Sequence, residues 1–156
     1  MTNLIYLIVF VLCSSQFLAN GLNIYSENEV SARDGSDDDV DVWLAIMGKV
    51  FNVTEGRGFY GKEGPYSVFG AKDATGYFVS GKFDEDSANS VDYSNLDEKE
   101  IDNLKHWYTF YTQNPNYPQI GVMIGLFYDE QGVATQLTND LLLKLNVDAD
   151  GAAEEL

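Results

Sequence analysis

Imidazole and thiol groups are scarce in this sequence, because its 156 residues include one histidine and one cysteine. His106 could act as a general base or as a metal ligand, the roles that imidazole fills most often. With 100° of rotation per residue it lies opposite the apolar stripe of the surrounding helical pattern, so we expect it to be solvent-exposed. No nucleophile-elbow motif accompanies it. A single histidine also excludes any haem site that needs two histidine ligands.

Other motifs with known chemistry are missing as well. The glycines at 56, 58, 61 and 64 do not follow the dinucleotide-binding fingerprint, and the sequence has no Walker loop. Asp37-Asp38-Asp39 lacks the ligand spacing of a calcium-binding EF-hand loop. Cys13 lies in a segment that we expect to be removed, which excludes cysteine-based zinc, iron–sulfur and thiolate-haem sites from the mature chain. The sequence therefore favours a binding protein and predicts no enzyme.

The charge of the chain limits its partners. Its 25 Asp and Glu against 9 Lys and Arg give a formal net charge of -16 and a pI of about 4.1. Nucleic-acid binding needs a basic footprint, and docking on anionic lipid needs basic clusters. We therefore expect no nucleic-acid partner and no electrostatic membrane docking.

The N-terminal segment predicts export. Residues 4–12 read LIYLIVFVL, an unbroken apolar run of signal-peptide length that is shorter than the ~20 residues of a spanning helix. Small residues at Cys13 and Ser15 mark one candidate cleavage site, after Ser15, and those at Ala19 and Gly21 mark another, after Gly21. We expect a signal peptide over residues 1–21 and a secreted protein. The alternative is an uncleaved anchor in the endomembrane system.

The elements that must position any site follow from patterns in the rest of the chain. Ser26 and Glu29 have capping-box spacing, which predicts a short helix. Two β-prone runs, 42–47 and 50–53, predict a hairpin that turns at Gly48-Lys49. The segment 54–66 reads as a glycine-rich loop with one helical turn.

Helical patterns dominate the second half of the chain. Residues 67–81 predict short helical pieces broken by Gly70 and Gly76. The longest predicted helix spans 98–113, with Asp97 as N-cap and Glu100 completing a capping box. Residues 119–128 predict a strand, and 137–145 a short helix before an acidic tail. The apolar stripe of the long helix predicts core packing: Ile101, Leu104, Trp107, Tyr108 and Tyr111.

Two strings carry a family resemblance. Gly48–Thr54 (GKVFNVT) and Phe59–Tyr66 (FYGKEGPY) closely resemble the cytochrome-b5-like domain of the membrane-associated progesterone receptor family. The resemblance implies an α+β, cytochrome b5-like haem/steroid-binding fold, a small sheet with short helices that form a ligand cleft. We place this domain at residues 22–132, followed by a short helix and acidic tail at 133–156. Motifs between His106 and Gly132 most resemble a branch whose members begin with a secretory segment.

The resemblance also implies a ligand and its site. Tyr60 matches the axial tyrosine, which would hold the iron of a ferric b-type haem through its phenolate oxygen. Tyr66 matches a second pocket tyrosine that hydrogen-bonds near the first, and Tyr117 matches a third. Asn116 stands where some members carry a lysine.

The function implied by the resemblance is secreted, non-catalytic haem binding, as an extracellular factor that promotes neuronal differentiation through an unknown receptor. A haem-linked dimer is a further expected state. One alternative is a carrier of steroid or another flat apolar ligand. A second is an electron-transfer haem protein, against which the missing histidine pair and the low potential expected of tyrosinate ligation both argue.

Overall fold

Residues 22–152 are described by the computed structural model of the chain, and their fold is α+β. Four strands form one mixed sheet in the order β1-β4-β3-β2. The strands are β1 (Asn23–Tyr25), β2 (Trp43–Ile46), β3 (Lys49–Asn52) and β4 (Gln119–Met123). β1 runs parallel to β4, and the other neighbours are antiparallel. The small sheet confirms the fold class predicted from the sequence.

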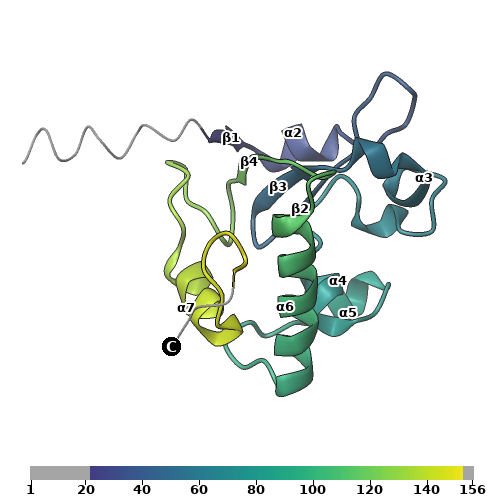
Figure 1. The fold of residues 1–156 in the computed structure, drawn as a ribbon. Coiled ribbons are helices and arrows are strands. Elements are labelled where there is room, and N and C mark those ends of the chain that lie inside the picture. The colour runs from purple at the N-terminus through teal and green to yellow at the C-terminus, as the bar shows by residue number, and fades with distance from the viewer. Residues whose placement is uncertain (1–21, 153–156) are drawn as a thin grey trace, which may run out of the picture.

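Short helical segments lie between β1 and β2 and between β3 and β4 in the chain. They are α2 (Glu27–Ser31), η1 (Thr54–Gly56), α3 (Arg57–Tyr60), η2 (Ser67–Phe69), α4 (Thr75–Ser80) and α5 (Glu85–Asn89). Two longer helices, α6 (Glu98–Gln113) and α7 (Gln136–Leu145), complete the described chain. Figure 1 shows α6 crossing the middle of the molecule, with α7 on one side and the short helices α3, α4 and α5 on the other.

The hairpin turns one residue earlier than predicted. Met47 and Gly48 both have positive φ, 48° and 72°, as the two central residues of a type I′ turn require. Lys49 is therefore the first residue of β3. A Cβ at Gly48 would lie 2.7 Å from the Tyr128 ring, so glycine is needed there for space as well as for conformation.

The Asp73 side chain connects this turn to the start of α4 through hydrogen bonds. Its carboxylate accepts hydrogen bonds from the Gly48 amide (2.8 Å) and the Thr75 amide (2.9 Å), and from the Thr75 hydroxyl. The adjoining backbone covers the edge of β2, where Ala45 donates to the Lys72 carbonyl at 2.8 Å. Covering an edge strand removes unpaired backbone groups that would otherwise template further pairing.

The predicted capping boxes are both present. Ser26 and Glu29 begin α2, and Asp97 and Glu100 begin α6, with side chain and backbone bonded reciprocally in each case. Each box satisfies amide groups that the first turn of a helix leaves without a partner. The sequence therefore placed the start of the longest helix correctly.

Two predictions about elements are wrong. The strand predicted over 119–128 ends at Met123, because its partner β1 has three residues and β3 four, and Gly125 turns the chain with a φ of 156°. Gly76 lies inside α4 and does not break a helix. A Cβ there would collide with the Ala88 carbonyl, so this glycine permits the close packing of α4 on α5.

One large core joins the sheet to both long helices. Its fully buried members include Leu44, Phe51 and Leu104, together with Leu141 and Leu145 of α7. Helix α7 is thus packed into the same core as the predicted domain. Across residues 22–152, no helix is both long and apolar enough to cross a membrane. The predicted signal peptide, residues 1–21, and the last four residues of the acidic tail lie outside the described part of the chain.

Candidate ligand site at a tyrosine cluster

A glycine-rich reversal of the chain brings two of the predicted tyrosines together. Tyr60 ends α3, and the Tyr66 amide bonds back to the Phe59 carbonyl at 2.8 Å. Gly64 allows this return, because a Cβ there would collide with that same carbonyl. The ring centroids of Tyr60 and Tyr66 consequently lie 6.2 Å apart.

The third predicted tyrosine arrives from a distant part of the sequence. Tyr117 follows the end of α6, and its ring meets that of Tyr60 edge-on, with centroids 5.8 Å apart at 86°. Gly56 makes room for this meeting. A Cβ there would lie 2.6 Å from the Tyr117 hydroxyl oxygen and 3.0 Å from the Tyr60 ring. The structure thus brings Tyr60, Tyr66 and Tyr117 into one cluster.

A fourth tyrosine in the cluster was not predicted as a site residue. The Tyr111 hydroxyl donates to the Tyr60 hydroxyl oxygen at 3.0 Å, and both side chains are buried. Tyr66 was expected to make a bond of this kind, but residues 22–152 offer its hydroxyl no hydrogen-bond partner. The helical stripe correctly placed Tyr111 in the core. Its phenolic oxygen was the only sign that this core position could also serve a site.

Burial controls the acidity of these phenols. It raises the pKa of Tyr60 above its ordinary value, and the hydrogen bond from Tyr111 partly opposes that rise. Burial also raises the pKa of Tyr111, and the neighbouring Tyr60 phenol adds to the effect. Both phenols are therefore protonated at neutral pH, and Tyr60 ionises only when a nearby cation compensates for the lost hydration.

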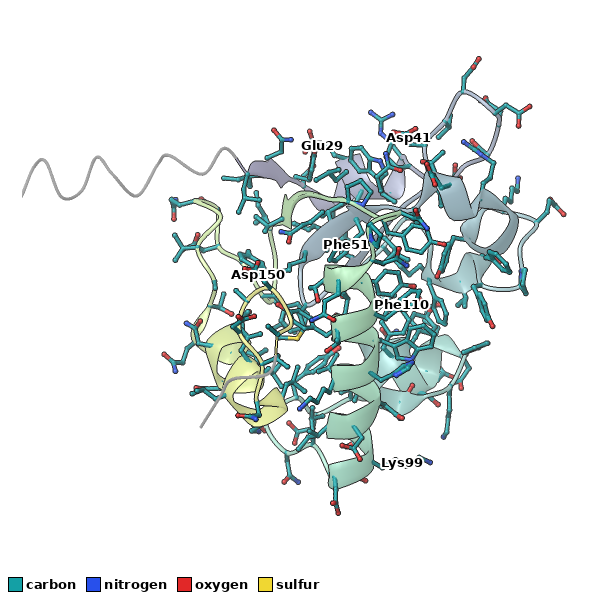
Figure 2. All side chains as sticks on the ribbon, viewed as in Figure 1. Glu29, Asp41, Phe51, Lys99, Phe110 and Asp150 are labelled. Carbon is teal, nitrogen blue, oxygen red and sulfur yellow. The ribbon has the colours of Figure 1, made fainter. Side chains whose placement is uncertain are left out.

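Flat aromatic surfaces surround the tyrosines. Tyr66 lies between Phe59 and Phe69 with its ring nearly parallel to both, at centroid distances of 6.3 and 5.8 Å. Three rim residues are exposed to solvent: Phe59 (55%), Phe83 (58%) and Phe110 (38%). Figure 2 places Phe110 on the flank of α6 nearer the short helices, with Asp150 on the opposite side. Phenolic oxygens beside flat apolar rings fit a planar ligand that carries a hard cation, such as ferric haem.

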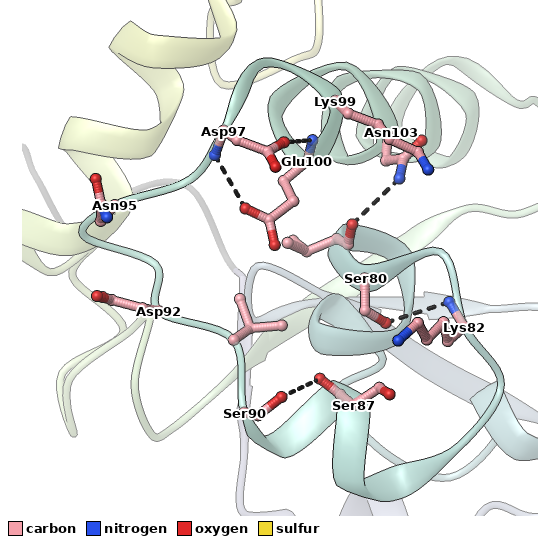
Figure 3. Close-up of a pocket in the computed structure, with 12 residues that line it drawn as sticks. Ser80, Lys82, Ser87, Ser90, Asp92, Asn95, Asp97, Lys99, Glu100 and Asn103 are labelled. Carbon is pink, nitrogen blue, oxygen red and sulfur yellow. Dashed lines mark hydrogen bonds between the residues drawn. The ribbon is translucent and has the colours of Figure 1, made fainter.

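Three cavities within residues 22–152 lie away from the tyrosine cluster. One of about 410 Å³ opens between α4, α5 and the start of α6, and Figure 3 shows its polar lining, which includes Ser80, Lys82 and Glu100. A second, also about 410 Å³, lies beside Asp73, and a third of about 170 Å³ adjoins it. None is lined by a tyrosine of the cluster. Pockets for apolar ligands are mostly apolar, so the first cavity suits such a ligand poorly.

His106 takes no part in the cluster. It is exposed on α6, as predicted, and its ring meets the edge of Trp107 at 5.2 Å. Over the described residues, no group of three or more His, Cys, Asp or Glu side chains is arranged to hold a metal ion.

Comparison with known proteins supports the resemblance seen in the sequence. Residues 26–124 match the cytochrome b5-like heme/steroid binding domain. Neuferricin of Xenopus tropicalis is 36% identical over 124 residues, covering 80% of this chain and 44% of that protein. Human neuferricin is 35% identical over 116 residues, covering 74% of this chain and 42% of its own. These proteins form the branch expected from the motifs between His106 and Gly132.

Two plant proteins agree with this assignment. Membrane-associated progesterone-binding protein 4 of Arabidopsis thaliana is 34% identical over 113 residues, covering 72% of this chain and 45% of that protein. A solved Arabidopsis thaliana protein with a cytochrome b5-like fold superposes with a TM-score of 0.55 at 33% identity, covering 68% of this chain and 94% of that one. The chain spans less than half the length of these three curated relatives.

Proposed function

The chain belongs to the cytochrome b5-like haem/steroid-binding domain family, and from that premise we propose that it binds ferric haem without catalysing a reaction. The observation that carries the proposal is the convergence of Tyr60, Tyr66 and Tyr117, joined by Tyr111, under a rim of exposed phenylalanines. A haem offers a flat apolar face to the rings and a hard cation to a phenolic oxygen.

Within this site we propose Tyr60 as the axial ligand. Its phenol must lose a proton to bind iron, and burial opposes that loss. The positive charge of ferric iron reverses the balance, because an adjacent cation favours the ionised form. The hydrogen bond that Tyr60 accepts at 3.0 Å acts in the same direction. An anionic oxygen ligand also favours ferric over ferrous iron, which argues against a role in electron transfer.

Tyr66 is the competing ligand, and two observations favour it. Its side chain is partly exposed, whereas Tyr60 is 6% exposed. Its hydroxyl makes no hydrogen bond within residues 22–152, so iron would displace no existing partner. In that arrangement Tyr60 would pack against the ligand tyrosine without binding the iron itself.

Titration with haemin, followed by absorption, tests both the site and the ligand. We expect the protein to bind haemin with a tyrosinate-to-iron charge-transfer band. Tyr60→Phe keeps the ring and removes the oxygen, so the band should vanish and affinity should fall at least about tenfold, or ~1.4 kcal/mol. Tyr66→Phe should retain the band.

The control for this titration is His106→Ala, which should change nothing because the imidazole is exposed and its ring contacts Trp107 and no tyrosine of the cluster. Loss of the band in Tyr66→Phe alone would transfer the axial role to Tyr66. Loss in neither tyrosine variant, or loss in His106→Ala, would refute the proposed site.

A carrier of steroid or another flat apolar ligand is the second candidate function. The exposed rings of Phe59, Phe83 and Phe110 favour it, since they would stack on such a ligand without any iron. A steroid that displaces haemin in the same titration would place both ligands at this surface.

We further propose that the protein is exported and acts outside the cell, in signalling that promotes neuronal differentiation. The apolar run at residues 4–12 supports export, and the signalling role follows from the family resemblance described for the sequence. N-terminal sequencing of protein from culture medium should find a start near residues 16–22.

A further inference from the structure

Two of the cavities form one groove beside the β2–β3 turn. The larger, of about 410 Å³, is lined by residues of α2, α4 and α5, and the smaller, of about 170 Å³, adjoins it. Asp73, Tyr93 and Met123 line both. Small-molecule sites usually have volumes of about 300–1,000 Å³, so the groove is large enough for a small organic ligand. No tyrosine of the cluster lines it, so its occupant is separate from the ligand proposed above.

Carboxylates dominate the charge of the larger cavity. Glu27 and Glu85 are exposed at its rim, whereas Asp73 is half-buried. The cavity also contains one ammonium, that of Lys72, which lies over the Tyr77 ring at 5.6 Å from its centroid. Three carboxylates against one ammonium leave two negative charges unbalanced. The net charge of the whole chain, -16, draws cations towards this surface as well.

A free hydroxyl lies beside the half-buried carboxylate. Tyr93 is partly buried, and residues 22–152 offer its hydroxyl no hydrogen-bond partner. Burial and the nearby charge of Asp73 raise the pKa of this phenol, so it stays a neutral hydroxyl at physiological pH. The Asp73 Oδ2 accepts one bond, from the Gly48 amide at 2.8 Å, which leaves that oxygen room for a second donor. An ammonium group in this part of the groove would donate to both oxygens.

Apolar surface suited to a methylene chain lines the same groove. Met123 and the Tyr93 side chain face both cavities, and Ala71 and Ala88 line the larger one. The Tyr93 ring packs edge-on against Phe127, with centroids 5.5 Å apart, which holds it in place. The groove therefore combines an inner carboxylate, two rim carboxylates and apolar walls.

We propose that this groove binds aliphatic diamines, with one ammonium on Asp73 and the Tyr93 hydroxyl and the other between Glu27 and Glu85. Two positive charges joined by an aliphatic chain balance the two unpaired negative charges of the lining. This inference goes beyond the proposed function, because it does not require haem at the tyrosine cluster.

Isothermal titration calorimetry of the full chain tests the groove with three probes of similar length: hexamethylenediamine, hexylamine and hexanediol. We expect affinity to fall in that order, because each probe in turn has one ammonium fewer. Added salt should weaken diamine binding, since ions screen the exposed carboxylates. Equal affinity for the three probes, or no binding of the diamine, would overturn the proposal.

A pair of double variants locates the site. Glu27→Gln with Glu85→Gln removes both rim charges and should weaken diamine binding at least about fivefold, with less effect on hexylamine. The control, Asp102→Asn with Glu130→Gln, removes two exposed carboxylates that line neither cavity, so diamine affinity should stay within about twofold. An equal loss in the two double variants would mean that overall charge alone attracts the diamine, and would refute the groove as its site.

Tyr93→Phe tests the inner end of the groove. It keeps the ring on Phe127 and removes a hydroxyl that has no partner among residues 22–152, so thermal stability without a probe should not change. Affinity for both amines should nevertheless fall at least about fivefold, because a hydrogen bond to a charged group is lost. Unchanged amine affinity in this variant would refute the placement of the inner ammonium.

Discussion

At the scale of single residues, Gly56 controls how closely the tyrosines approach one another. A methyl group in its place would meet the Tyr117 hydroxyl at 2.6 Å and the Tyr60 ring at 3.0 Å. We predict that Gly56→Ala pushes these rings apart and lowers haemin affinity at least about tenfold, ~1.4 kcal/mol. Titration of the variant with haemin measures the loss.

Gly58 provides the matched control for this prediction. It lies two residues further on, in α3, where an added Cβ would meet nothing within 4 Å. Gly58→Ala should leave haemin binding intact and stabilise α3 slightly, since alanine is the better helix former. Equal affinity in the two alanine variants would show that the spacing of Tyr60 and Tyr117 does not matter.

At the scale of elements, Asp73 joins the β2–β3 turn to α4 through hydrogen bonds from the Gly48 and Thr75 amides. Burial nevertheless raises the pKa of its carboxyl, because desolvation outweighs those bonds. The folded state therefore holds the proton more tightly than the unfolded chain. The stabilising contribution of the protonated form is full below pH 3.8, the unfolded value, and is lost as the pH rises through the raised folded pKa.

This sign gives a measurable prediction. Asp73→Asn does not titrate, so its stability supplies the reference. Between pH 3.8 and the raised folded pKa, the stability of the unaltered protein relative to Asp73→Asn should fall with rising pH by about 1.4 kcal/mol for each unit of pKa shift. Above the folded pKa the difference should level off. Urea unfolding at a series of pH values measures the difference. A difference that grows with pH would mean that the amide hydrogen bonds outweigh desolvation.

At the scale of the whole molecule, α7 belongs to the same core as the tyrosine-bearing part of the chain. Leu141 is fully buried in it, while Leu143, on the same helix, is 69% exposed. We predict that Leu141→Ala lowers the free energy of unfolding by about 2–5 kcal/mol through the cavity it leaves. Leu143→Ala should stay within about 0.5 kcal/mol of the original.

Chemical denaturation followed by tryptophan fluorescence and by circular dichroism tests this pair. One shared transition that shifts in Leu141→Ala would show that α7 and the sheet unfold together. Two transitions, with the sheet unaffected by Leu141→Ala, would instead make α7 an independent appendage.

Features that depend on neighbours along the chain could be predicted from the amino-acid sequence. Capping boxes at Ser26 and Asp97 act over three residues, so they could be read directly and were correct. The turn of the hairpin was predicted within one residue. Gly48 indicates a position with positive φ, but the sequence does not say whether the second such residue precedes or follows it. The grouping of Tyr60 with Tyr66 came from the family resemblance and not from their spacing; in the structure their ring centroids lie 6.2 Å apart.

Contacts between residues far apart in the sequence depend on how the helices and strands fold against one another. Tyr111 and Tyr60 are 51 positions apart, and nothing local to α6 indicates that a core tyrosine would donate to a ligand candidate in another helix. Lys49 donates to the Ala149 carbonyl across 100 positions, which fixes the C-terminal segment against the hairpin. The end of β4 also depended on the lengths of its partners. Periodicity and composition report the burial of each residue in turn, whereas pairing depends on how the elements pack against one another.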